Sequence, residues 1–308
     1  MSQPARIIVV GSINMDLVFR THQLPRPGET ITGHSFQQVP GGKGANQAVA
    51  AARLGAQVSM VGRIGDDGFG RTLIEGLTEE SIDTSFVKVT PNCSSGLAVI
   101  GVEDSGQNSI TVIPGANGFV TPDDVIAAEE LFQSADVLLG QFEIPLPAVQ
   151  KAVELAHRYG VKIILDPAPS VRVVPADLLQ VNVICPNETE AESLSGQVVD
   201  SIETAMSAVQ QIGSRGPQIS LITLGSHGVV VFDGKTSEHV PPFSVDAIDT
   251  TAAGDAFAAA FGIALAEQMS VSEATRFASA AGALATIKHG AQPAMPTREA
   301  VEALLRGR

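Results

Sequence analysis

Short apolar runs alternate along the chain with longer segments in which apolar residues recur at helical spacing. The short runs are rich in β-branched residues and predict buried strands over residues 7–10, 58–62, 137–140, 162–166, 183–186, 220–224 and 229–232. The longer segments predict helices over residues 43–54, 122–132, 147–159, 187–194, 201–212, 253–267, 272–287 and 297–305. This alternation predicts an α/β fold of three layers, in which helices cover both faces of a mainly parallel central sheet.

Two stretches depart from this alternation. Residues 14–40 carry Pro and Gly amid alternating apolar and polar positions, and residues 94–114 form two extended runs around a polar turn. Together they predict a small β-sheet beside a core made of residues 1–13, 41–93 and 115–308. A small sheet with one apolar face is not stable alone, so we expect it to cover a site as a lid or to pair with a second copy.

Composition narrows the range of partners. The chain has 308 residues, 19 Lys plus Arg against 33 Asp plus Glu, and a formal net charge of −14. We therefore expect no nucleic-acid partner, because such a surface needs positive charge. The longest apolar tract, residues 256–266, is shorter than the about 20 residues that span a bilayer, so we expect a buried helix and no membrane insertion.

The cysteines and the N-terminus bear on the compartment. Cys93 and Cys185 are too few and too far apart for a disulfide framework or a zinc site. Residues 1–6 lead directly into an apolar strand and lack the features of a signal peptide. These observations predict a cytoplasmic protein with reduced thiols.

Small residues precede a carboxylate at the start of one predicted helix, in the segment Asp249-Thr250-Thr251-Ala252-Ala253-Gly254-Asp255. The backbone amides of Ala252, Ala253, Gly254 and Asp255 can crowd around an anion there, and the helix dipole favours negative charge. Asp255 could accept the proton of an attacking hydroxyl, or it could merely cap the helix. The segment therefore predicts an anion hole with a base beside it.

A second glycine cluster, Gly41-Gly42-Lys43-Gly44-Ala45-Asn46, opens another alanine-rich helix. Glycines permit close approach of a ligand to the backbone, Lys43 supplies a mobile charge, and Asn46 can bond hydroxyl groups. The alternative interpretation is a glycine turn before a core helix.

On these two segments, with Asn187-Glu188-Thr189-Glu190 between them, the chain resembles the PfkB family of sugar kinases along nearly its whole length. The opening residues 11–16 and the closing residues 288–293 resemble the ribokinase group of that family. The resemblance implies a ribokinase-like fold and transfer of the γ-phosphoryl group of ATP to O5 of D-ribose, giving D-ribose 5-phosphate. It implies Mg²⁺ with ATP, K⁺ as activator, Asp255 as general base with Lys43 nearby, and a dimer through the lid.

A sugar site needs several amides and carboxylates, because each hydroxyl both donates and accepts. Asn14 and Asp16 follow a predicted strand at its carboxyl end, where α/β sheets bind ligands, although they could simply form a turn. The resemblance implies that the pentose site is made by Ser12, Ile13, Asn14, Asp16, Gly42, Lys43, Gly44, Ala45, Asn46, Glu143 and Asp255.

The resemblance also implies a nucleotide site. Its expected members are Asn187, Thr223, Leu224, Gly225, Ser226, His227, Gly228, Gly254 and Ser279, with Glu190 ordering water on Mg²⁺. Asn187 and Glu190 also fit a helix capping box, which needs no ligand, and a glycine turn between strands is common. Ala258 stands where the family often has Asn, which puts nucleotide affinity in doubt.

The expected K⁺ site consists of Asp249, Thr251, Ala285, Lys288, Gly290 and Ala294. Ala294 stands where a serine is common in the group. Two rival interpretations stay open: a kinase of the same family that acts on 2-deoxyribose, fructose or adenosine, and a catalytically silent sugar-binding regulator. Asn14 favours a sugar with a hydroxyl near C2, and the intact Lys43 and Asp255 favour an enzyme.

Overall fold

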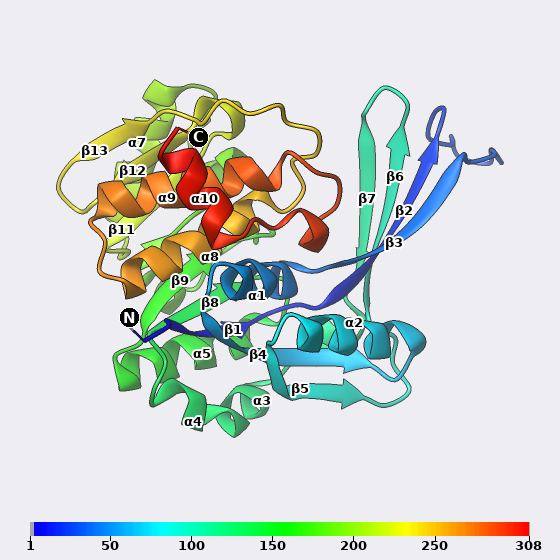
Figure 1. The fold of residues 1–308 in the computed structure, drawn as a ribbon, viewed down its shortest axis with the longest axis horizontal. Coiled ribbons are helices and arrows are strands. Elements are labelled where there is room, and N and C mark those ends of the chain that lie inside the picture. The colour runs from blue at the N-terminus through cyan, green and yellow to red at the C-terminus, as the bar shows by residue number, and fades with distance from the viewer. Residues whose placement is uncertain (1–2, 308) are drawn as a thin grey trace.

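A nine-stranded sheet forms the body of the protein, and a four-stranded sheet stands beside it (Figure 1). The computed structural model describes residues 3–307. The strands of the large sheet follow the order β13-β12-β11-β10-β9-β8-β1-β4-β5. They are β1 (Arg6–Val10), β4 (Gln57–Gly65), β5 (Asp83–Thr90), β8 (Val137–Gln141), β9 (Lys162–Asp166), β10 (Val183–Ile184), β11 (Ile219–Thr223), β12 (Val229–Phe232) and β13 (Ser237–Val240).

All pairs from β5 through β11 are parallel, and β12 and β13 extend that edge antiparallel. Parallel strands must be buried on both faces, and β1 shows how this is achieved. Its residues Ile7 and Val9 join one hydrophobic core, whereas Ile8 and Val10 join the other. The predicted α/β fold with a mainly parallel sheet is therefore confirmed.

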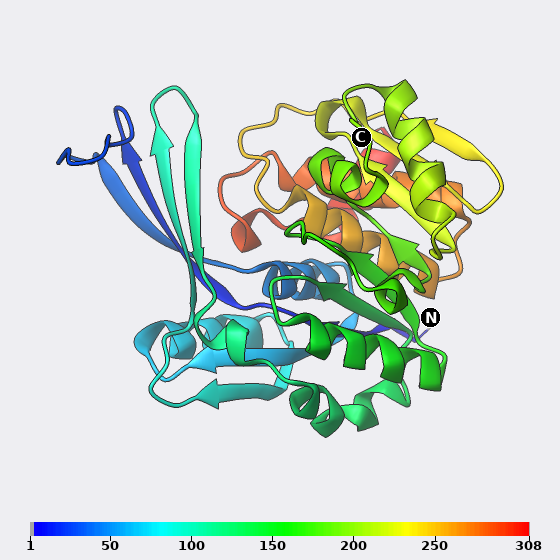
Figure 2. The same cartoon turned by 180° about the vertical axis from the view of Figure 1, so that it is seen from behind.

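Helices cover both faces of the large sheet (Figures 1 and 2). One layer contains α1 (Lys43–Arg53), α2 (Gly68–Glu79), α8 (Ala253–Ala266), α9 (Val271–Ala285) and α10 (Arg298–Leu305). The other contains α3 (Pro122–Ala127), α4 (Glu129–Phe132), α5 (Leu146–Tyr159), α6 (Glu188–Ser195) and α7 (Ile202–Gly213). No helix within residues 3–307 has both the length and the apolar composition needed to cross a membrane.

Helix α8 is buried from Asp255 to Ala264, and most of its buried side chains are alanine. Small side chains let neighbouring helices approach closely, and α8 packs between α1 and α9. At its N-terminal end, a Cβ added to Gly282 of α9 would lie 3.2 Å from the carbonyl oxygen of Ala253. This close packing brings the start of α8 beside the start of α1.

The small sheet has the order β3-β2-β6-β7. Its strands are β2 (Asn14–Thr21), β3 (Ser35–Gly41), β6 (Gly96–Glu103) and β7 (Asn108–Ile113). The β2–β3 and β6–β7 pairs are antiparallel, whereas β2 and β6 run parallel. The sheet projects away from the body (Figure 1), and every residue of its edge strand β7 is exposed.

Several elements differ from the sequence-based expectation, and helix α2, over Gly68–Glu79, is one that was not predicted. Strands β5 and β13 were not predicted, because both lie at edges of the large sheet and carry many exposed polar residues. The helix predicted over residues 122–132 is interrupted at Ala128, which separates α3 from α4.

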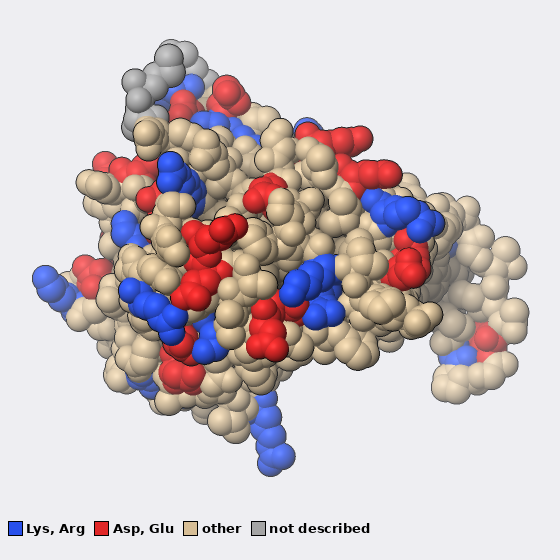
Figure 3. All heavy atoms as spheres, turned by 90° about the horizontal axis from the view of Figure 1, so that it is seen from below, with Lys and Arg blue, Asp and Glu red and all other residues tan. Residues whose placement is uncertain are grey.

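Acidic and basic side chains are intermixed over the face of the molecule shown in Figure 3.

A buried charge cluster ties α3 to β4 and β5. The Asp124 side chain is 1 % exposed and accepts hydrogen bonds from Arg63 Nε at 2.7 Å and Arg63 Nη2 at 2.9 Å. Lys88 Nζ lies 2.9 Å from Asp124 Oδ1, the oxygen that also accepts from Arg63 Nη2. Although burial opposes ionisation of Asp124, its bonds to Arg63 and Lys88 lower its pKa to about 2.

We expect Asp124→Ala to lower the free energy of unfolding by about 3 kcal/mol at pH 7, because it leaves Arg63 partly buried without its partner. The depressed pKa adds a pH dependence. The contribution of Asp124 is fully present above its unfolded pKa of about 3.9 and is lost as the pH falls towards about 2. Urea unfolding measured from pH 7 to pH 3 checks both expectations.

The matched control is Arg158→Ala, because Arg158 is 53 % exposed in its ion pairs with Glu129 and Glu154. Loss of such a surface pair costs about 0–1 kcal/mol. Equal losses for the two variants would contradict the structural role of Asp124.

Candidate active site

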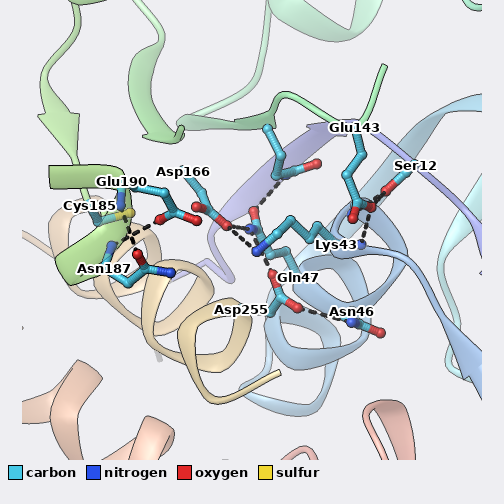
Figure 4. Close-up of polar contacts among 12 residues, drawn as sticks. Ser12, Lys43, Asn46, Gln47, Glu143, Asp166, Cys185, Asn187, Glu190 and Asp255 are labelled. Carbon is cyan, nitrogen blue, oxygen red and sulfur yellow. Dashed lines mark hydrogen bonds and ion pairs between the residues drawn. The ribbon is translucent and has the colours of Figure 1, made fainter. Parts of the chain in front are cut away.

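The polar residues singled out in the sequence meet at the carboxyl ends of β1, β8, β9 and β10, beside the N-termini of α1 and α8 (Figure 4). Asp255 lies in the first turn of α8 and is 3 % exposed. Its Oδ2 accepts from Asn46 Nδ2 at 2.9 Å, and its Oδ1 accepts from Gln47 Nε2 at 3.1 Å. Two consecutive residues of α1 therefore hold the carboxylate of Asp255.

Lys43 begins α1 and contacts the ends of two strands of the large sheet. Its Nζ lies 3.3 Å from Asp166 Oδ2 at the end of β9. Its backbone N–H donates to Glu143 Oε2 at 3.1 Å, and the hydroxyl of Ser12 donates to the same oxygen at 2.5 Å. Glu143, just after β8, thus joins the end of β1 to the start of α1.

Four carboxylates act on the ammonium group of Lys43. Burial opposes the charged form of Lys43, but Asp166, Asp255, Glu143 and Glu190 outweigh it and raise its pKa well above the usual range. Burial also raises the pKa values of Asp255 and Asp166. Burial, together with the charges of Glu143 and Asp255, raises the pKa of Asp16 to about 7. The site therefore favours cations and contains carboxylates that take up protons readily.

The start of α8 is suited to bind an anion. Ala252 has φ 59°, in the left-handed region that costs a residue with a side chain about 1–2 kcal/mol. Within residues 3–307, no side chain caps this helix N-terminus. The N–H of Ala253 donates to the carbonyl of Thr250 at 3.3 Å, which leaves the amides of Gly254 and Asp255 available to a ligand. The helix dipole favours a negative charge there.

Asn14 and Asp16, which were expected to bind a sugar, are buried in β2. Asn14 Oδ1 accepts from Asn117 Nδ2 at 2.7 Å, and Asn117 also bonds both backbone groups of Ile13. Two glycines are needed on steric grounds. A Cβ added at Gly41 would lie 2.3 Å from Asp16 Oδ2, and one added at Gly44 would lie 2.6 Å from the Ser12 nitrogen.

The remaining residues of the glycine cluster place α1 against the end of β1. Gly42 has φ 87°, which favours glycine, and precedes the first turn of α1. The N–H of Ala45 donates to the carbonyl of Ser12 at 2.9 Å. The glycine cluster, with Ser12, Ile13, Asn14 and Asp16, thus forms one continuous wall.

The expected nucleotide residues lie at the neighbouring strand ends. Asn187 Oδ1 accepts from the Glu190 N–H at 3.0 Å, and Glu190 Oε2 accepts from the Asn187 N–H at 2.9 Å. This is a complete capping box at the start of α6. Glu190 is nevertheless 9 % exposed and acts electrostatically on Lys43 and Asp166. Asn187 and Glu190 thus form the capping box and are also the two side chains expected to act on the nucleotide.

Thr223 pairs with Asn187 through a parallel bridge, which places the two segments side by side. After Leu224, residues Gly225–His227 form a 3₁₀ turn in which Ser226 and His227 are exposed, and Gly225 and Gly228 both have positive φ. In α9, Ser279 is 9 % exposed, and its hydroxyl has no hydrogen-bond partner among residues 3–307. Ala258, where the family often has Asn, is buried in α8.

The two halves of the expected cation site lie together. Asp249 Oδ1 accepts from the hydroxyl of Thr251 at 2.6 Å, and Asp249 Oδ2 accepts from the Gly290 N–H at 2.9 Å. Burial opposes ionisation of Asp249, but these bonds keep its pKa below the usual value. Ala285 at the end of α9 and Ala294 are buried, whereas Lys288 is exposed.

The sequence-based analysis missed Gln47, Asn117, Gln141 and Asp166 as site residues. Gln47 Nε2 also lies 3.2 Å from Asp166 Oδ2, and Gln141 Nε2 donates to Gln47 Oε1 at 2.6 Å. Two signals could have found three of them. Gln141 and Asp166 end their strands at the edge where ligands bind, and Gln47 lies four residues after Lys43 on the same helix face.

An α/β fold whose uncapped helix start faces a half-buried lysine and a buried aspartate is the arrangement expected of a small-molecule kinase. The sequence pattern of the pfkB family carbohydrate kinases matches residues 4–298. The chain belongs to this family of carbohydrate kinases.

Individual relatives agree with this membership. A ribokinase of Haemophilus influenzae is 42 % identical over 294 residues, which cover 95 % of this chain and 96 % of the relative. A deoxyribokinase of Salmonella typhi is 36 % identical, with 95 % and 96 % of the two chains covered. The solved structure of Arabidopsis thaliana ribokinase complexed with ribose and ATP superposes with a TM-score of 0.90 at 35 % identity, covering 99 % of each chain.

Proposed function

We propose that the protein phosphorylates D-ribose at O5 with ATP and releases D-ribose 5-phosphate and ADP. The observation that carries the proposal is the placement of Asp255. Its carboxylate is held by Asn46 and Gln47, lies beside the free amides of α8, and shares its surroundings with Lys43. The similarity to ribokinases along the chain supports ribose as the sugar.

In this proposal, Asp255 accepts the proton of the ribose 5-hydroxyl while the oxygen attacks the γ-phosphorus of ATP. The bond from that phosphorus to the bridging oxygen breaks, and ADP leaves with the electron pair. The amides of Ala252, Ala253, Gly254 and Asp255 bind the charge on the transferring group, and Lys43 adds a positive charge nearby.

The carboxylate-rich site fits a nucleotide that arrives with a cation. Mg²⁺ bound with ATP would offset the phosphate charge, and Glu190 would reach it through water. Asn187 and the segment Thr223–Gly228 lie together and would contact the nucleotide, with Ser279 near the base. The proposal places the reaction in the cytoplasm, where ATP is available.

The wall formed by Ser12, Ile13, Asn14, Asp16 and the glycine cluster, together with Glu143, would bind the pentose hydroxyls. A second candidate substrate is 2-deoxyribose, because a deoxyribokinase is among the relatives. Asn14 favours ribose, since a buried amide beside C2 would lose its partner with the deoxy sugar, at a cost of about 1–3 kcal/mol. Ribose is therefore expected to exceed deoxyribose, fructose and adenosine in kcat/KM.

We expect Asp255→Asn to lower kcat by about 10²–10⁴, because the proton of the ribose hydroxyl loses its acceptor. ADP release measured with ribose, Mg²⁺ and K⁺ checks this. The matched control is Asp177→Asn, since Asp177 is exposed and its side chain only accepts from Gln150. Turnover within about tenfold of wild type in Asp255→Asn would contradict the base assignment.

The proposal includes activation by K⁺ at the site around Asp249. An ionised carboxylate, the hydroxyl of Thr251 and nearby carbonyls form a donor set that suits K⁺, and water could replace the hydroxyl that Ala294 lacks. Because Asp249 links the segment before α8 to residue 290, cation binding would order the start of the anion hole.

We expect the ribose kinase rate to rise when K⁺ replaces Tris in sodium-free buffer. Asp249→Ala should remove this response, because it deletes the carboxylate that joins the two halves of the site. Rates measured on both proteins from zero to about 100 mM K⁺ check the expectation. At about 100 mM the ionic strength is high enough to screen exposed charges. Identical rates for wild type with and without K⁺ would refute it.

The small sheet (β2, β3, β6 and β7) is proposed to serve as a lid over the sugar and as the contact between two copies in a homodimer. Ile110 and Val112 of its edge strand are 55 % and 50 % exposed. Both lie on the same face as Asp16, because Val112 pairs with Ala98 and Ala98 pairs with Asp16. A second copy would cover these apolar side chains.

We expect wild type to be a dimer at micromolar concentration and Ile110→Asp/Val112→Asp to be monomeric. The reason is that two charges would replace apolar side chains at the contact. Light scattering coupled to gel filtration measures the mass. Thr111→Asp is the control, because Thr111 is exposed on the opposite face of β7, and it should leave the mass unchanged. A monomeric wild type would contradict the dimer.

A further inference from the structure

Gln47 lies between two buried carboxylates (Figure 4). Its side-chain nitrogen is 3.1 Å from Asp255 Oδ1 and 3.2 Å from Asp166 Oδ2, and the residue is 1 % exposed. An amide nitrogen carries two hydrogens, so it can donate one to each carboxylate. Gln47 thus bridges the proposed proton acceptor to the carboxylate that contacts Lys43.

The orientation of this amide is fixed by its other partner. Gln141 is fully buried at the end of β8, and its nitrogen donates to Gln47 Oε1 at 2.6 Å. A flipped Gln47 would place its oxygen against two carboxylate oxygens and its nitrogen against the donor group of Gln141. Only one orientation therefore satisfies all three neighbours.

From these contacts we infer that Gln47, oriented by Gln141, is a positioning residue that holds the carboxylate of Asp255 ionised and correctly directed for proton transfer. The inference rests on the proposed function and deepens it. Each oxygen of Asp255 accepts one amide hydrogen, from Asn46 on one side and Gln47 on the other. Asn46 is also expected to bind the sugar, whereas Gln47 has all its hydrogen-bonding groups engaged within the protein.

Several other charges act on Asp255. Lys43 from α1 favours its ionised form, whereas burial and Asp166 from β9 favour its protonated form. Asp16 from β2 is also coupled to Asp255, and Glu143 and Glu190 lie around the same lysine. Against this background, a hydrogen bond from Gln47 lowers the pKa of Asp255. Removal of that bond should therefore make Asp255 protonate at a higher pH.

The test is Gln47→Leu, which removes both donated hydrogens while keeping much of the volume. We expect kcat to fall about 10- to 100-fold, within the range of a misplaced base, while KM for ribose and ATP changes by less than about threefold. The acid limb of the kcat profile should move to higher pH by about half a unit or more. Gln141→Leu should move the limb in the same direction by less, because Gln47 then loses its orienting partner.

Ser220→Ala serves as the control for loss of a buried polar group, since Ser220 is buried in β11 and its hydroxyl has no partner among residues 3–307. It should leave the kcat profile unchanged. A folded Gln47→Leu whose acid limb and kcat match those of wild type would overturn the inference. Where Gln47→Leu does not fold, an unmoved acid limb in Gln141→Leu overturns it instead.

The two hypotheses fail in different ways. An active wild type whose variants keep its pH profile overturns the role of Gln47 alone. A wild type that prefers deoxyribose, fructose or adenosine overturns the ribose assignment, and the same pH profiles are then measured on the preferred substrate. A wild type that phosphorylates none of the sugars overturns both.

Discussion

The gathering of carboxylates around one ammonium group governs the architecture of this site. Lys43 is the only cation that the side chains place among Asp16, Glu143, Asp166, Glu190 and Asp255 within residues 3–307. Such an excess of buried negative charge is costly unless other positive charge reaches it. Helices α1 and α8 both begin at the site, and the positive ends of their dipoles supply part of that charge. The alanines of α8 and the glycines before α1 matter because they allow both helix ends to approach so closely.

The residues of the proposed site come partly from the body formed by the large sheet and its helices and partly from the projecting small sheet. Asp255, Lys43, Glu143 and Asp166 all come from helix starts or strand ends of the large sheet, where packing on both faces fixes the backbone. Asn14 and Asp16 belong to β2, which continues from β1 into the small sheet. The proposed phosphoryl-transfer groups are thus held by the core, whereas part of the proposed sugar site belongs to the more exposed element.

Much of the fold could be predicted from the sequence, because buried strands are continuous apolar runs and the helices between them carry boundary residues. Strands β5 and β13 escaped prediction since edge strands need little apolar surface. In the site, Asp255, Lys43 and Asn46 stood out through glycine and alanine neighbours. Gln47, Gln141 and Asp166 did not, because their contacts join residues 94, 119 and 208 positions apart, which no local pattern records. Asn187 and Glu190 remained ambiguous because a capping box and a ligand site require the same residue types.

The position of Asp16 links the geometry of the small sheet to acid–base chemistry. Burial and the charges of Glu143 and Asp255 raise the pKa of Asp16 towards neutrality. Asp16 belongs to the small sheet, whereas Glu143 and Asp255 belong to the body that surrounds the large sheet. Coulomb energies depend on separation, so any tilt of the small sheet would change how strongly these groups repel. The protonation of Asp16 and the position of β2 relative to the large sheet are therefore linked.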